Sequence, residues 1–92
     1  MQTRDVVLAA IGRARIWIRD LIEGRAGSFE EIARREGKGE RHVRLLGSLA
    51  FVSPSVVAAI IDGNAPAGLT VTGLARIIPA DWAEQERQIG IT

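Results

Sequence analysis

The sequence has no cysteine and no tyrosine, and it has one histidine, one methionine and three prolines among 92 residues. Without cysteine there is no disulfide framework and no thiolate metal site, and one histidine supplies too few nitrogen ligands for a zinc or iron centre. No apolar run approaches the length of a membrane span, and Arg4, Asp5, Arg13 and Arg15 interrupt the N-terminal region too early for a signal peptide. We therefore expect a cytoplasmic protein that uses no metal, cofactor, membrane or small-molecule substrate.

Strand-like alternation is also nearly absent, whereas helical spacing of apolar residues is frequent. At 47% hydrophobic residues, a chain of this length can bury a core as one domain spanning residues 1–92. The pattern predicts an all-α fold, a small bundle of about six helices containing a helix-turn-helix. Capping residues and glycines place the helices at about 4–23, 29–36, 40–51, 55–62, 70–77 and 82–88, with Pro79 closing the fifth.

The first of these helices has one apolar stripe, and its residues recur at spacings of three and four. The predicted inward residues are Val7, Ile11, Ala14, Ile18, Leu21 and Ile22. The two tryptophans, Trp17 and Trp82, are expected to pack in the core or between helices, and not to stack on nucleic-acid bases.

A helix-turn-helix is predicted at about residues 28–51. Ser28 and Glu31 form a capping box, in which the serine oxygen accepts from the Glu31 amide and the glutamate reaches back. Two helices that cross through a tight turn need a small residue inside the first helix and a residue tolerant of positive φ in the turn. Ala33 and Gly37 meet those demands, and Ile32, Val43 and Leu46 supply apolar contacts.

If Val43 and Leu46 face inward, the opposite face of the second helix points outward through Glu40, Arg41, Arg44 and Ser48. A recognition helix presents such a face to the major groove, where arginine binds guanine bidentately. Arg41 and Arg44 are the predicted base readers, with Glu40 accepting from cytosine. Ser28, Lys38 and His42 are the predicted phosphate contacts.

The basic residues are unevenly distributed, although the net charge is only +1. Residues 1–47 hold ten Arg and Lys against seven Asp and Glu, and residues 48–92 hold two against four. This asymmetry favours a basic face suited to a polyanion. The expected partner is double-stranded DNA, bound by a monomer or weak homodimer.

The run "SFEEIARREGKGERHVRLLGSLAFVSPSVVAAIIDGNAPAGLTVTGLARIIPADWAEQERQIGI", with the preceding "AIGRARIWIRDLIEG", resembles the C-terminal helix-turn-helix region of bacterial serine site-specific recombinases of the resolvase/invertase type. The resemblance implies sequence-specific DNA targeting. Gly39 departs from the family pattern, which usually has a serine or threonine cap there. No segment is long enough for the catalytic domain, and caps and helix surface explain Ser28, Ser48, Ser53 and Ser55, so we expect no enzyme activity. An excised domain and a free-standing regulator both fit this sequence.

Four other interpretations stay open. The plan "EIA…G…V…L" followed by "P…V…AI…G" is also similar to the helix-turn-helix core of bacterial partition (ParB-type) proteins, which would imply centromere-like DNA recognition, and a transcription regulator is a related possibility. The apolar helix at 54–62 could instead serve a protein adaptor or dimerisation module. Finally, residues 28–51 could form an ordinary helical hairpin whose arginines are only solvated.

Overall fold

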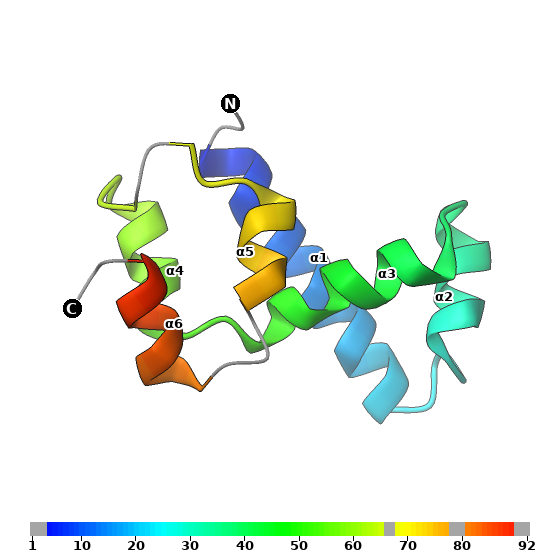
Figure 1. The fold of residues 1–92 in the computed structure, drawn as a ribbon. Helices are drawn as coiled ribbons and strands as arrows, with labels where there is room; N and C mark the ends of the chain where they lie inside the picture. The colour runs from blue at the N-terminus through cyan, green and yellow to red at the C-terminus, as the bar shows by residue number, and fades with distance from the viewer. Residues whose placement is uncertain (1–3, 66–67, 78–80, 90–92) are drawn as a thin grey trace.

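Six α-helices and one short 3₁₀ helix make up the computed structural model, which describes residues 4–65, 68–77 and 81–89 (Figure 1). No strand occurs in those ranges, so the expected all-α class with six helices is confirmed. Pro79, the predicted end of the fifth helix, lies outside them. The elements are α1 (Arg4–Ile22), α2 (Phe29–Glu36), α3 (Glu40–Gly47), the 3₁₀ helix η1 (Ser48–Phe51), α4 (Pro54–Ile61), α5 (Val71–Ile77) and α6 (Trp82–Ile89).

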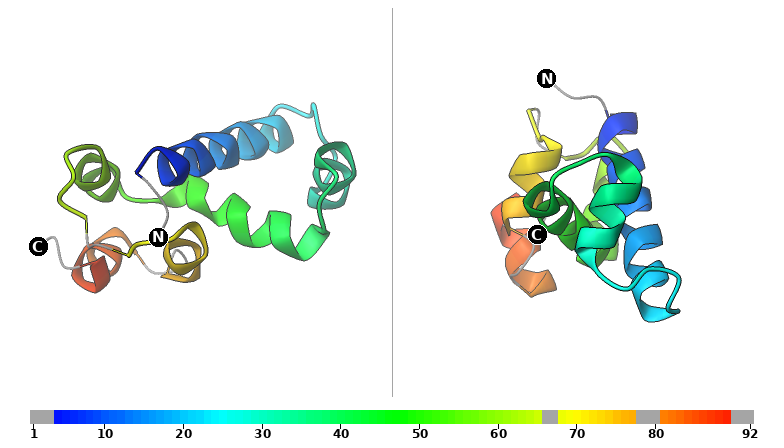
Figure 2. Two further views of the ribbon diagram at one scale, coloured as in Figure 1. Left: turned by 90° about the horizontal axis from the view of Figure 1, so that it is seen from above. Right: turned by 90° about the vertical axis from the view of Figure 1, so that its right-hand side faces the viewer.

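Helix α1 is the element around which the others gather. It contacts α3, η1, α4 and α5, while α2 packs on α3 and α6 packs on α4. Seen from above, α2 lies at one end of the molecule and α4 and α6 lie at the other (Figure 2). At its first turn, the Arg4 guanidinium donates to the Ile61 carbonyl at 2.8 Å, which joins the start of α1 to the end of α4.

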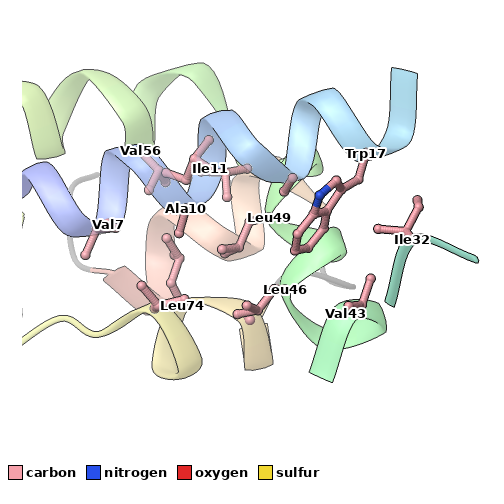
Figure 3. Packing of buried hydrophobic residues seen from close by; sticks show 14 of the residues in the cluster. Val7, Ala10, Ile11, Trp17, Ile32, Val43, Leu46, Leu49, Val56 and Leu74 are labelled. Atoms are coloured by element: carbon pink, nitrogen blue, oxygen red, sulfur yellow. The ribbon is translucent and has the colours of Figure 1, made fainter. Parts of the chain in front are cut away.

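The buried face of α1 differs in part from the predicted stripe. Val7, Ile11 and Ala14 are buried as expected, but the buried face continues through Trp17 and Asp20. Ile18 and Leu21 are only half-buried, and Ile22 is 80% exposed, so placing Ile22 in the core was wrong. The buried face turns along the helix because Val7 and Ile11 lie near Val56 and Leu74, whereas Trp17 lies near Ile32 and Val43 (Figure 3).

The chain turns sharply between η1 and α4, where Glu40–Phe51 and Pro54–Ile61 meet at 93°. Ser53 is buried here and caps α4, accepting from the Ser55 and Val56 amides. The buried Gln85 side chain accepts from the Ser53 amide at 2.9 Å, which fastens α6 to this corner. Within the described ranges no single helix has the length and apolarity to cross a bilayer; the two segments at this corner pass by length and composition only when taken together.

Two expectations for the second half of the chain are modified. Trp82 is 56% exposed, so it is not a core residue; its indole N–H donates to the Phe51 carbonyl at 3.1 Å. Helix α4 packs between α1 and α6 and buries Val56 and Ile60, but Ile61 at its end is 52% exposed. The apolar side chains of α4 are therefore mostly used within the fold.

Candidate nucleic-acid interface

The segment from Ser28 to Phe51 contains two short helices joined by a tight turn, and local interactions explain both ends of α2. The Ser28 hydroxyl accepts from the Glu31 amide at 3.1 Å, as the capping box predicts. The Glu31 carboxylate reaches one residue further back than expected, to the Gly27 amide at 2.7 Å. Gly37 has φ +69°, and the Lys38 amide donates to the Ala33 carbonyl at 2.9 Å, so α2 ends in a left-handed glycine cap.

A buried carboxylate fixes α2 against the end of α1. Asp20 accepts from Arg25 at 2.9 Å, in the loop, and from Arg35 at 3.1 Å, on α2, while its own side chain is 11% exposed. The hydrogen bond from Arg25 is the main reason that the pKa of Asp20 lies below its ordinary value, and Arg35 adds to the effect against the opposing influence of burial. This cluster was not predicted from the sequence, although Asp20 stands on the apolar side of α1.

Helix α3 begins without a side-chain cap. Gly39 has φ −73° and ψ 147°, and its carbonyl accepts from the Val43 amide at 3.1 Å, so glycine serves as the N-cap here. Val43 and Leu46 are buried against α1 and the core, as predicted. The opposite side of the helix therefore faces solvent and carries Glu40, Arg41 and Arg44, which are all exposed.

Arg44 is held by two neighbours. Its guanidinium donates to one Glu40 oxygen at 2.8 and 3.2 Å, and it lies 5.2 Å from the centre of the Phe29 ring. Phe29 in turn rests on Gly47, where an added Cβ would lie 3.0 Å from a ring carbon. Phe29 was not among the predicted site residues; the signal that could have revealed it is a glycine inside a short helix.

Lys38 and His42 add two further cationic or titratable side chains to this segment. Lys38, Arg41 and His42 are exposed, and neither Lys38 nor Arg41 pairs with a carboxylate anywhere in the described part of the chain. In the turn and α3 together, Lys38, Arg41 and Arg44 face a single acid, Glu40. This is a local positive surplus on a solvent-facing helix.

The two predicted serine contacts are already engaged within the protein. Ser48 is half-buried, and its hydroxyl contacts the Leu45 carbonyl at 2.6 Å and the Ala75 carbonyl at 3.4 Å. The expectation that Ser48 points outward was therefore wrong, because α5 covers this end of α3. Ser28 is exposed, but the Glu31 carboxylate bound to the preceding amide places negative charge beside it, which weakens its case as a phosphate contact.

Glu40, Arg41 and Arg44 thus share the exposed face of α3, and Lys38 stands in the turn before it. His42 is exposed on the flank of the helix, roughly 160° around the axis from Arg44. The hydroxyls of Ser28 and Ser48 make hydrogen bonds within the protein. Among the residues that the structure describes, no three His, Cys, Asp or Glu side chains gather as a metal ion would require. Comparisons of this chain with protein-family models, with curated proteins and with solved structures find no match.

Proposed function

We propose that this chain binds double-stranded DNA by placing α3 in the major groove. The observation that carries the proposal is the outward face of α3, where Arg41 is exposed and has no carboxylate partner among the described residues, while Val43 and Leu46 anchor the opposite face. A short helix held by its apolar side and presenting arginine on the other is the arrangement that major-groove readers use.

The two arginines are proposed to act differently. Arg41 is free to bind guanine O6 and N7, which discriminates against other bases by about 1–3 kcal/mol. Arg44 already donates two hydrogen bonds to Glu40 and lies over Phe29. It must either exchange Glu40 for a base or meet the DNA with Glu40 attached, so Arg41 is proposed as the main base reader.

Lys38 and His42 are proposed as phosphate contacts at the edge of the groove. Lysine on a phosphate adds affinity without sequence preference, and each such contact steepens the salt dependence of binding. In keeping with the resemblance to serine recombinases, we propose that this DNA binding targets a recombinase-type protein to its site, and that the chain itself acts by binding and not by catalysis.

The experiment is selection from a pool of random duplexes, followed by titration of an enriched duplex at two salt concentrations. We expect one sequence class to be enriched, with affinity that falls as salt rises. Lys38→Ala should make the fall of log K with log salt less steep by about one, without changing the selected sequence. Arg41→Ala should weaken discrimination between bases at one position. Absence of salt-sensitive binding would exclude the proposal.

A further inference from the structure

A second surface, between α1 and η1, includes none of the residues assigned to DNA. It is an open groove of about 340 Å³ lined by Arg15, Ile18, Arg19, Ile22, Ala50 and Phe51. The four α1 residues stand at positions i, i+3, i+4 and i+7 and so form one stripe along the helix. This stripe borders the one that faces the core through Ala14 and Trp17, and Ile18 is half-buried at the border between them.

The groove exposes apolar side chains that the fold leaves uncovered. Ile22 is 80% exposed and Phe51 is 56% exposed, although both are large and apolar. Beside them, Trp82 is also 56% exposed, and its indole N–H and the Gln85 amide both donate to the Phe51 carbonyl, at 3.1 and 3.4 Å. These bonds fix the end of η1, which forms one wall, so the groove exists before any partner arrives.

Two unpaired cations flank this apolar floor. Arg15 and Arg19 are exposed, and no acid within the described ranges forms an ion pair with either of them. Arginine binds carboxylates through its planar pair of N–H donors. The two arginines therefore favour an occupant with anionic groups, and the apolar floor favours one that also has apolar groups.

An acidic amphipathic segment of a protein satisfies both requirements. A DNA duplex offers phosphates but no side chains to cover Ile22 and Phe51. A second copy related by two-fold symmetry would bring the same patch against itself and face Arg15 and Arg19 with their own counterparts. We infer that the groove binds an acidic amphipathic segment of another protein, with apolar side chains over Ile22 and Phe51 and carboxylates on Arg15 and Arg19. This inference does not rest on the proposed DNA binding.

The test uses the whole chain and a fluorescein-labelled helical peptide of about four turns, with leucines at i, i+3, i+4 and i+7 and glutamates beside them. A peptide with lysine in place of every glutamate is its control. Fluorescence anisotropy should show binding of the acidic peptide alone. Ile22→Ser should weaken binding about tenfold or more, as should Arg15→Ala with Arg19→Ala. Ile16→Ser should leave it unchanged, because Ile16 is 54% exposed yet lies outside the groove.

The exposure of Ile22 means that Ile22→Ser should fold normally, which circular dichroism checks. Equal binding of both peptides, no binding of either, or equal effects of Ile16→Ser and Ile22→Ser would overturn the inference. Concentration-dependent dimerisation that Ile22→Ser abolishes would assign the groove to a second copy and overturn it as well. Displacement of the acidic peptide by random duplex DNA would do the same in favour of nucleic acid.

Discussion

Ile32 fixes the position of α2, and its truncation should destabilise the whole domain. Its side chain is fully buried and lies near Trp17 and Val43, where α1, α2 and α3 meet (Figure 3). Ile32→Ala removes three buried carbon groups, which at about 0.8 kcal/mol each amounts to about 2.4 kcal/mol of lost transfer energy. The cavity left behind raises the expected loss to about 3–4 kcal/mol. That is a large share of the roughly 5–14 kcal/mol typical of a domain of this size.

The matched control is Ile22→Ala, which makes the same chemical change on a side chain that is 80% exposed. Urea unfolding followed by circular dichroism should place this variant within about 0.5 kcal/mol of the wild type. The midpoint temperature of thermal unfolding should be at least about 12 °C lower for Ile32→Ala than for the wild type, since 1 kcal/mol corresponds to roughly 4–8 °C for such domains. Similar losses for the two variants would refute the packing described for α2.

Substitutions at Gly37, Gly47 and Asp20 test local features, the first two with a second substitution for comparison. Gly37→Ala should destabilise the fold by about 1–2 kcal/mol because residue 37 has φ +69°. Gly12→Ala lies within α1, with open space at the added Cβ, and should stabilise the fold by about 0.5–1 kcal/mol. Differential scanning fluorimetry should show opposite shifts of the midpoint temperature for the two variants. Gly47→Ala should lower stability by about 1–3 kcal/mol in urea unfolding by pressing on the Phe29 ring, and Phe29→Leu should recover part of the loss. The pKa of Asp20 is lower in the folded protein than its ordinary value of 3.8, so the ionised carboxylate stabilises the fold at pH values above 3.8. This stabilisation is lost as the pH falls through the folded pKa. Asp20→Asn should therefore be less stable than the wild type at pH 7, and thermal scans should show that difference shrinking below about pH 4; a constant difference would exclude the ion cluster.

Features governed by local chemistry could be predicted from the sequence. The cap at Ser28, the left-handed Gly37 and the proline after Ser53 each depend on residues within one turn of the chain, and the structure has all three. Thr70 and Asp81 likewise accept from the Gly73 and Glu84 amides, at 2.9 and 2.8 Å. Helix ends were predictable because capping is a local interaction.

Features that depend on distant partners could not be predicted. Periodicity places Ile18 and Ile22 on one apolar side of α1, but which direction is buried depends on where α2 and α3 pack, and they pack on the side of Trp17. The engagement of Ser48 with Ala75 and of Trp82 with Phe51 joins residues about thirty positions apart, which no local pattern encodes. The candidate DNA face was predictable in its arginines but not in the Glu40 and Phe29 contacts that hold Arg44.

Binding of two double variants to a selected duplex tests whether α3 reads DNA. Arg41→Ala with Arg44→Ala removes one unpaired arginine and one that is ion-paired within its helix. Arg76→Ala with Arg87→Ala removes the same charge and the same kinds of side chain elsewhere, since Arg76 is exposed without an acid partner in the described ranges and Arg87 pairs with Glu84. We expect the first variant to lose sequence-specific binding and the second to keep it. Equal loss in both would show that binding reads total charge and not the face of α3.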